Sequence, residues 1–277
     1  SWIYQFGTKY SDEFIYRDTQ FFTEKYMIKK LVDSIDIDLH TRVMDPACGG
    51  GNFLLYSLKK MVNLHDGTNE HRSLRSLENI YGYEIDCFLA AIASFNLKMK
   101  ALSFICKEQS ISAETFIKCR TNIYYPVEHT VSGFLDYAWE KQVVINFDTK
   151  ELIKLYDIFD RVSVVITNPP FRTIKGMPSE QKSYLQEHYP LSKCDMCNSF
   201  IERILQVLPH NGQAAMVTQN SWMYLDSFTL LRAEILQKYT IDSIWELGSN
   251  AFYNLSGEKA NVVLVTFTKN KPSKEHM

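Results

Sequence analysis

Apolar and polar positions follow two periods along this chain, and the segments that they define alternate. Short apolar runs rich in β-branched residues predict strands, and stretches with an apolar residue every three or four positions predict helices. The predicted strands are residues 43–46, 80–84, 122–125, 162–167, 213–218, 241–247 and 260–268. The predicted helices are residues 22–35, 52–62, 86–99, 198–208 and 228–239. This alternation predicts an α/β fold on a mostly parallel, doubly wound sheet.

Three stretches show no clear period. Residues 65–76 are polar and predict a loop. Between residues 100 and 150 the pattern is weak outside the strand that Pro126 ends. Residues 172–193 are polar and rich in Gly, Pro, Ser and Lys, and a long loop after a strand is usually functional or disordered. We therefore expect residues 172–193 to form a loop that closes over a bound ligand.

The most specific chemical signal is Asn168-Pro169-Pro170-Phe171, directly after the apolar run 162–167. The prolines stiffen the backbone and remove two N–H donors, which leaves carbonyl oxygens beside the Asn168 amide oxygen. If the Asn168 oxygen and the Pro169 carbonyl accept both hydrogens of a base's exocyclic amine, the nitrogen lone pair is freed for attack. Phe171 offers an apolar face on which a planar base can stack. Taken alone, the motif also fits a strand that ends in a proline turn.

A glycine-rich turn joins the first predicted strand to the helix after it. The turn consists of Asp45, Pro46, Ala47, Cys48, Gly49, Gly50, Gly51 and Asn52. Glycine permits positive φ and close approach of a ligand, and a helix start offers N–H groups to a carboxylate. No Gly-Lys-Ser/Thr follows, and the spacing does not match the dinucleotide fingerprint GxGxxG. The turn therefore predicts a site for a ligand with a carboxylate and no phosphate.

Acidic residues end the second predicted strand. Glu84 and Asp86 follow the segment Ile80-Tyr81-Gly82-Tyr83, where carboxylates are suitably placed to accept hydrogen bonds from ribose hydroxyls. A ligand with a ribose, an amino-acid carboxylate and no phosphate is S-adenosylmethionine. The sequence thus predicts a site for this cofactor, formed by the glycine-rich turn together with Glu84 and Asp86.

In this order, DPACGGGNFL, GYEID and NPPF resemble the motifs of amino-group DNA methyltransferases, especially adenine-N6 enzymes of the type I and type IIG kind. Residues 221–223, 228–232, 246–252 and 256–258 are similar to the PglX-type methyltransferases of BREX phage-defence systems. The resemblance extends from about residue 21 to residue 267. It implies a Rossmann-like, S-adenosylmethionine-dependent methyltransferase that acts on the adenine N6 amine of double-stranded DNA, by direct attack and without a covalent protein intermediate.

The same resemblance assigns further residues. Thr23 matches the segment that contacts the methionine part of the cofactor, although Glu24 stands where the family usually has proline. Phe252 matches an aromatic residue that stacks, with Phe171, on the extruded base. No acidic residue clearly ends a third strand to hold the cofactor adenine, and Asp136 is the nearest candidate.

The implied organisation is an N-terminal helical cap at residues 1–40, which contributes to the cofactor site, and a catalytic domain at residues 41–270. The formal net charge is -2, whereas non-specific affinity for DNA comes mainly from Lys and Arg that face phosphates. We therefore expect a target-recognition region outside this chain, on the natural polypeptide or on a partner subunit, and other defence-system proteins as possible partners. Residues 172–193 are expected to close over the DNA.

Other residue types add little. Six cysteines at irregular spacing predict free thiols in a reducing cytoplasm. Cys194 and Cys197 have no second pair or histidine spaced to complete a zinc site, so a helix start is favoured, and we assign no metal. Cys48 is expected in the turn for its small size. No apolar run is counted as a membrane span, and the N-terminus does not resemble a signal peptide.

Three other functions remain open on the sequence. Cytosine-N4 methylation uses the same chemistry on a similar motif. Methylation of an RNA base or of a protein glutamine amide also employs Asn-Pro-Pro-aromatic, although DPACGGG and the Phe252 region resemble DNA enzymes. A module that binds cofactor and DNA without turnover is the non-enzymatic alternative, and the intact NPPF argues against it.

Overall fold

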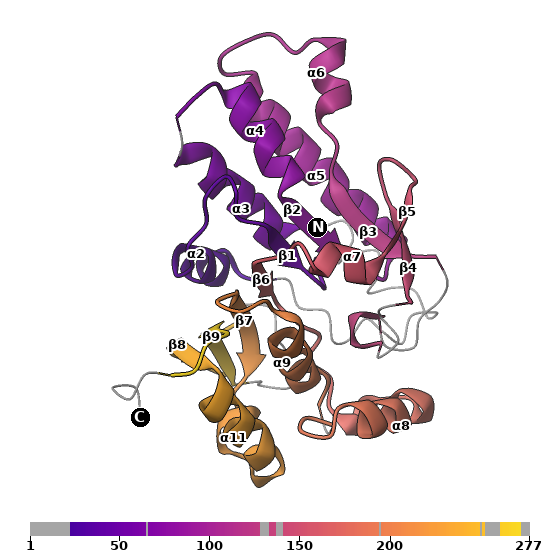
Figure 1. Ribbon diagram of the computed structural model, residues 1–277, viewed down its shortest axis with the longest axis vertical. Coiled ribbons are helices and arrows are strands. Elements are labelled where there is room, and N and C mark those ends of the chain that lie inside the picture. The colour runs from indigo at the N-terminus through magenta and orange to yellow at the C-terminus, as the bar shows by residue number, and fades with distance from the viewer. Residues whose placement is uncertain are drawn as a thin grey trace.

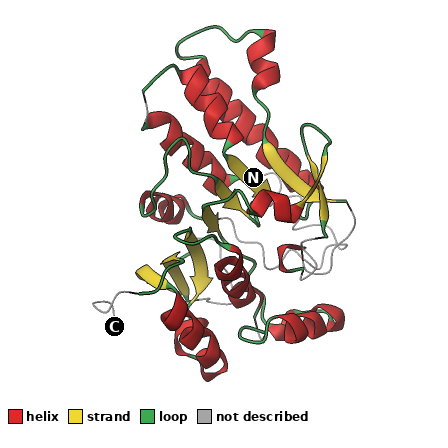
Figure 2. Ribbon diagram, viewed as in Figure 1, coloured by secondary structure: helices red, strands yellow, loops and turns green. Residues whose placement is uncertain are grey.

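The computed structural model describes residues 23–64, 66–127, 133–136, 141–193, 195–249, 251–252 and 261–272. Residues 1–22 of the expected cap, Cys194, and the segment 256–258 lie outside the described residues. The described chain forms a nine-stranded sheet with the strand order β5-β4-β3-β2-β1-β6-β7-β9-β8. Figure 2 shows helices on both sides of these strands.

The strands are β1 (Val43–Asp45), β2 (Ile80–Tyr83), β3 (Asn122–Pro126), β4 (Val143–Asn146), β5 (Leu152–Lys154), β6 (Val164–Thr167), β7 (Gln213–Gln219), β8 (Thr240–Gly248) and β9 (Val262–Thr268). The helices are α2 (Lys25–Asp33), α3 (Asn52–Asn63), α4 (Asn69–Glu78), α5 (Cys87–Ile105), α6 (Ala113–Lys118), α7 (Leu155–Phe159), α8 (Ser179–His188), α9 (Met196–Val207), α10 (Ser221–Tyr224) and α11 (Thr229–Lys238). Single 3-10 turns are η2 (Gly133–Leu135), η3 (Ile174–Gly176) and η4 (Asp226–Phe228).

Strand direction confirms the predicted fold class. Strands β1, β2, β3, β6 and β7 pair in parallel. Of the described strands, only β4 and β9 run against this direction, because β5 and β8 each pair antiparallel with one of them and so return to the direction of the others. The sheet is mostly parallel and doubly wound, with one antiparallel strand next to each edge strand that the sequence pattern did not predict.

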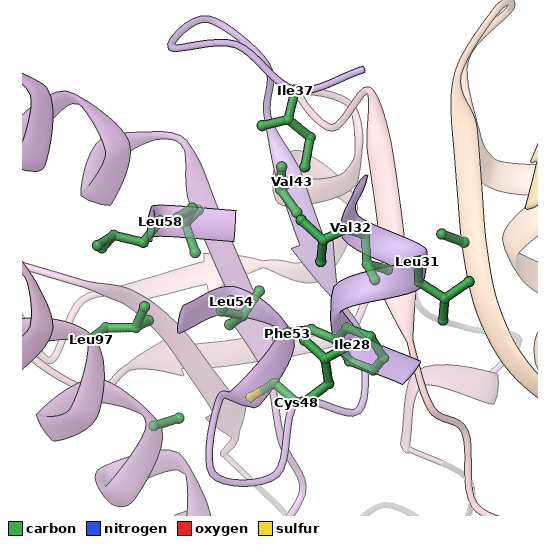
Figure 3. Close-up of a cluster of buried hydrophobic side chains, with 14 of the residues drawn as sticks. Ile28, Leu31, Val32, Ile37, Val43, Cys48, Phe53, Leu54, Leu58 and Leu97 are labelled. Carbon is green, nitrogen blue, oxygen red and sulfur yellow. The ribbon is translucent and has the colours of Figure 1, made fainter. Parts of the chain in front are cut away.

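The two faces of the sheet carry separate hydrophobic clusters, because successive side chains of a strand point to opposite faces. Val43 packs with α2, α3, α4 and α5, while its neighbour Met44 packs with α7, α9 and α11. Val164 and Val165 in β6 divide in the same way. Figure 3 shows Val43 among side chains from α2 and α3. This double burial accounts for the nearly continuous apolar runs of the central strands.

The polar stretch at residues 65–76 is mostly helix α4, so the loop prediction was wrong. The Thr68 side chain caps this helix by accepting a hydrogen bond from the His71 N–H. Its buried face contains Asn69, Ser73 and Ser76 beside Leu77. These positions keep the helical spacing, but small polar residues occupy them, and a pattern based on apolar residues therefore misses the period.

The predicted loop at residues 172–193 was also wrong in part. It contains η3 and the helix α8, in which Gln181 and Leu185 are buried. Tyr189 follows α8, is 1% exposed, and donates a hydrogen bond from its hydroxyl to the Leu135 carbonyl of η2 at 2.5 Å. The end of this segment is thus fixed to the body of the molecule.

Helix α5 is long and apolar enough to cross a membrane by length and composition, which corrects the expectation that no run qualifies. Half of its most apolar window is buried inside the protein, and Leu89, Ala93 and Leu97 belong to the cluster on the sheet. A core helix passes the same test, so this single helix is weak evidence for a membrane span. The described cysteines are free: Cys48, Cys87, Cys106, Cys119 and Cys197.

Candidate active site at the carboxyl edge of the sheet

The strand order reverses at β1. This strand pairs with β2 on one side, where Val43 lies opposite Ile80, and with β6 on the other, where Val43 lies opposite Val164. In Figure 1 the N-terminal half, in indigo and magenta, and the C-terminal half, in orange, meet there. The loops after β1 and β6 diverge from neighbouring strands at the same edge, which is where open α/β sheets bind ligands. This topology brings together the motifs that the sequence places far apart.

The glycine-rich turn leaves β1 with two residues in the left-handed region, Gly49 at φ +52° and Gly51 at φ +84°. A Cβ at Gly51 would lie 3.3 Å from the Cα of Ala93 in α5, so a side chain there would be both strained and crowded. At Gly49 no atom of the described residues lies within 4 Å of the Cβ position. Among these residues the backbone of Gly49 is therefore open on the side where a side chain would otherwise stand, which leaves room there for a ligand.

Glu84 ties this turn to the end of β2. Its carboxylate accepts the Gly49 N–H at 2.8 Å and the Asp86 N–H at 3.1 Å. The side chain is buried, at 6% exposure. Burial raises the pKa of Glu84 to about 7, against the opposing effect of the two N–H donors. The turn and the acidic strand end, predicted to bind one ligand, are thus in direct contact.

Asp45 is a second buried carboxylate at the same edge. It is 2% exposed and accepts the Ala47 N–H at 3.1 Å. Burial raises the pKa of Asp45 to about 7, and the negative charge of Glu84 adds to this rise, whereas the Thr167 hydroxyl and the Ala47 N–H oppose it. Asp45 therefore couples the end of β1 to both neighbouring strands.

The other predicted cofactor residues lie around this pair. Pro46 and Cys48 are buried, Ala47 is half-buried, and Asn52 is the first residue of α3. Asp86 caps α5, because one carboxylate oxygen accepts the N–H groups of Phe88 at 2.8 Å and Leu89 at 3.2 Å. The role of Asp86 in binding the cofactor is separate from this cap and stays a prediction.

Asn168 directly follows β6, next to the end of β1. Its side-chain nitrogen donates a hydrogen bond to the Thr23 hydroxyl at 3.0 Å. Pro169 is buried and Pro170 is half-buried. Thr23, which the sequence linked only to the cofactor, therefore contacts the catalytic motif itself.

The two aromatic residues predicted to stack on a base lie against each other. The rings of Phe171 and Phe252 have centroids 6.1 Å apart at an angle of 68°, and each residue is 6% exposed. The Tyr26 hydroxyl donates to the carbonyl of Ala251, beside Phe252, at 2.7 Å. Tyr26 is a site neighbour that the sequence did not single out, because no local pattern links residues so far apart.

The weak candidate for the cofactor adenine, Asp136, follows η2. Its carboxylate accepts a hydrogen bond from the Tyr184 hydroxyl of α8 at 3.1 Å. This contact ties Asp136 to a helix on the face of the sheet opposite to α3. Its role toward the adenine stays a prediction. Within the described ranges, no group of three His, Cys, Asp or Glu side chains is arranged to hold a metal ion.

A family model described as "Eco57I restriction-modification methylase" matches residues 78–253, which is more than half of the chain. An adenine-specific methyltransferase PglX from Lacticaseibacillus casei (strain Zhang) is 23% identical over 304 residues, with 90% of this chain and 25% of that protein covered. The methylase subunit of the type I restriction enzyme EcoEI from Escherichia coli is 25% identical over 260 residues, with 92% of this chain and 44% of that protein covered. The chain thus spans a quarter to less than half of these relatives.

Among solved structures, a nuclease-deletion mutant of the type ISP restriction-modification enzyme LlaGI, in complex with a DNA substrate mimic, superimposes with a TM-score of 0.66. The two sequences are 16% identical, and the superposition covers 99% of this chain and 25% of the LlaGI chain. At this identity the likeness establishes the fold alone. The same α/β fold occurs in a protein from Listeria monocytogenes that is described as a putative class I S-adenosylmethionine-dependent methyltransferase, with 14% identity and a TM-score of 0.50.

Proposed function

The chain belongs to the Eco57I restriction-modification methylase family, and from this premise we propose that it binds S-adenosylmethionine and methylates the N6 amine of adenine in double-stranded DNA. The observation that carries the proposal is the position of Asn168-Pro169-Pro170-Phe171. The motif follows β6, the neighbour of β1, whose own loop is the glycine-rich turn held by Glu84. A set of acceptors for an amine and a turn suited to a cofactor thus share one edge of the sheet.

The residues of the turn fit the cofactor. The open side of Gly49 lets a ligand approach the backbone, and the buried carboxylates of Asp45 and Glu84 supply hydrogen-bond acceptors. We assign the methionine part to Thr23, Asp45 and the turn residues 46–52, and the ribose hydroxyls to Glu84 with Asp86. When bound, S-adenosylmethionine supplies a methyl group activated by its sulfonium charge.

The catalytic work of the chain is to align and polarise the target amine. The side-chain oxygen of Asn168 and the carbonyl of Pro169 each accept one amine hydrogen, which draws the nitrogen towards a tetrahedral geometry. Pro170 keeps the backbone rigid, and Phe171 and Phe252 stack on the base once it leaves the duplex. The catalytic advantage comes from acceptors fixed before the reaction. In the present arrangement the Phe171 and Phe252 rings contact each other, so a base that stacks between them must separate them.

We favour adenine over cytosine because relatives from two organisms carry the name adenine-specific methyltransferase. The same relatives, with the type I methylase subunits, motivate a role in a restriction-modification or BREX-type defence system in the cytoplasm. We assign residues 1–40 to a cap over the cofactor and residues 41–270 to the catalytic domain. Target recognition is assigned to another part of the natural protein or to a partner subunit.

A methyl-transfer assay tests this function. The protein is incubated with S-adenosylmethionine labelled in the methyl group and with duplex DNA, RNA or protein, and the labelled product is digested and identified. We expect label in N6-methyladenine from DNA. Label in N4-methylcytosine, in RNA or in protein glutamine would refute the assigned substrate, and binding of cofactor without any transfer would favour a module without turnover.

A further inference from the structure

Thr23, which precedes the N-cap of α2, and Tyr26, in the first turn of α2, contact two loops that are distant in the sequence. The Thr23 hydroxyl accepts a hydrogen bond from the Asn168 side-chain nitrogen at 3.0 Å, across 145 positions. The Tyr26 hydroxyl donates to the Ala251 carbonyl at 2.7 Å, across 225 positions. One contact ends on the amine-binding asparagine and the other beside Phe252. These two side chains therefore connect both halves of the proposed target-base site.

The Thr23 contact gives the Asn168 amide one orientation in this structure. An amide has a nitrogen that donates and an oxygen that accepts. Because the nitrogen donates to the Thr23 hydroxyl, the oxygen stands at the other end of the amide, and an oxygen is the acceptor that an amine requires. The hydrogen bond to Thr23 therefore holds the Asn168 side chain at the position proposed for it in the reaction.

The Tyr26 contact holds the segment that carries Phe252. Ala251 and Phe252 are 5% and 6% exposed, and the Phe252 ring meets Phe171 of the catalytic motif. Tyr26 itself is 42% exposed, so its link to this segment depends on the hydroxyl hydrogen bond more than on packing of the ring. Removal of that hydroxyl leaves the Ala251 carbonyl without this donor.

Helix α2 can serve as a fixed reference because it is anchored in the core. Met27, Ile28, Leu31 and Val32 are all buried, and Figure 3 shows Ile28, Leu31 and Val32 near Phe53 of α3. At the other end of the helix, the Lys60 ammonium of α3 donates to the carbonyls of Val32 at 2.8 Å and Ile35 at 2.7 Å. Its first turn is therefore held in place independently of any substrate.

We propose that Thr23 and Tyr26 are positioning residues for methyl transfer: Thr23 holds the Asn168 side chain in place, and Tyr26 holds the segment that carries Phe252. This proposal rests on the proposed function. It differs from the contact with the cofactor expected for Thr23, because it predicts an effect on the rate of transfer at saturating cofactor.

The test compares Thr23→Val, Thr23→Ser and Tyr26→Phe in the intact protein. Calorimetry gives the affinity for S-adenosylmethionine, and single-turnover assays at saturating cofactor and DNA give the rate of transfer. Thr41→Val is the control for loss of a threonine hydroxyl, since Thr41 hydrogen-bonds to Asp38 at the opposite end of β1. Tyr156→Phe is the control for Tyr26, because Tyr156 is 41% exposed on α7.

Thr23→Val is expected to lower the transfer rate at saturating cofactor about tenfold to a hundredfold, the range for a misplaced reacting group, and Thr23→Ser is expected to restore that rate. Tyr26→Phe is expected to lower it about threefold to tenfold, the rate equivalent of one neutral hydrogen bond. If the wild type is active and Thr23→Val and Tyr26→Phe both transfer at its rate, the positioning role is overturned and the proposed function is not. A wild type that binds cofactor but methylates no DNA would overturn the proposed function and this role with it.

Discussion

At the scale of single residues, the carboxylates of Asp45 and Glu84 dominate the electrostatics of the candidate site. Both are almost fully buried, and burial raises the pKa of each to about 7. Since the charge of Glu84 also raises the pKa of Asp45, ionisation of one opposes ionisation of the other. A ligand that donates hydrogen bonds to either carboxylate favours its charged form, so cofactor binding and protonation are coupled at this edge.

The raised pKa values of Asp45 and Glu84 predict how the stability of the protein without cofactor depends on pH. In the unfolded chain both groups titrate near their ordinary values of about 4. Between about pH 4 and pH 7 the folded protein therefore binds more protons than the unfolded chain, so these groups make it less stable as pH rises through that range. We expect the free energy of unfolding to fall on the order of 1–3 kcal/mol from pH 5.5 to pH 8. Urea denaturation should show a smaller fall in Glu84→Gln, and an equal fall in both proteins would contradict these pKa values.

Glu84→Ala should weaken the binding of S-adenosylmethionine. It removes the proposed acceptor for the ribose hydroxyls and the acceptor of the Gly49 N–H, which holds the turn. The expected loss is about 1–3 kcal/mol of binding free energy, the range for an unsatisfied buried polar group. Calorimetric titration measures it, with Glu78→Ala at the exposed end of α4 as the matched control. Unchanged affinity in Glu84→Ala would refute the assignment.

Asn168→Ala should separate binding from chemistry. Asn168 is proposed to contact the target amine and not the cofactor, so cofactor affinity should stay near that of the wild type. Loss of one fixed acceptor should lower turnover on the order of a hundredfold or more. Steady-state kinetics with the calorimetric affinity tests both statements. Turnover near the wild-type level would mean that the motif is only a turn after β6.

At the scale of elements, the sequence predicted the strands and helices whose apolar residues recur with a clear period. Strands buried on both faces, such as β6 and β7, and amphipathic helices, such as α9, appear at the predicted positions within a few residues. Helix α4 was missed because small polar residues form its buried face. The strands β4 and β5 were missed because runs of three or four residues are too short to show a period.

The N-terminal cap of helix α4 can be tested at the scale of elements. Thr68 caps it through its side chain, whereas Thr173, before η3, makes no such hydrogen bond. Thr68→Ala should lower the free energy of unfolding by about 1 kcal/mol, the typical effect of losing a cap, and Thr173→Ala should leave it nearly unchanged. Equal effects in chemical denaturation would contradict the capping role.

The local motifs of the site could be predicted from the sequence, but the contacts between them could not. The turn after β1, the acidic end of β2 and the motif after β6 are local patterns, and their meeting follows from the order of the strands. The contacts of Thr23 with Asn168 and of Tyr26 with Ala251 join residues across most of the chain. No spacing in one sequence encodes such contacts, because they depend on where α2 packs.

At the scale of the whole molecule, two halves of the chain form one sheet and meet at β1 and β6. The formal net charge is -2, and the proposed site offers stacking and amine acceptors, neither of which distinguishes one flanking sequence from another. The fold therefore accounts for the proposed methyl transfer more fully than for the choice of a target.

We accordingly expect this chain alone to bind duplex DNA weakly and with little sequence preference, with a dissociation constant on the order of 10⁻⁴–10⁻⁶ M at physiological salt. Fluorescence anisotropy with random and genomic duplexes measures this affinity. Tight binding to one sequence by residues 1–277 would show that recognition is built into this chain.

The most direct test of the central claim is nucleoside analysis of DNA from cells that make the intact protein with its recognition region or partner. Mass spectrometry compares cells with the wild type, cells with Asn168→Ala and cells that lack the gene. The account predicts N6-methyldeoxyadenosine above background with the wild type alone. Wild-type DNA with no more of this nucleoside than the Asn168→Ala sample, or with N4-methyldeoxycytidine instead, would contradict it.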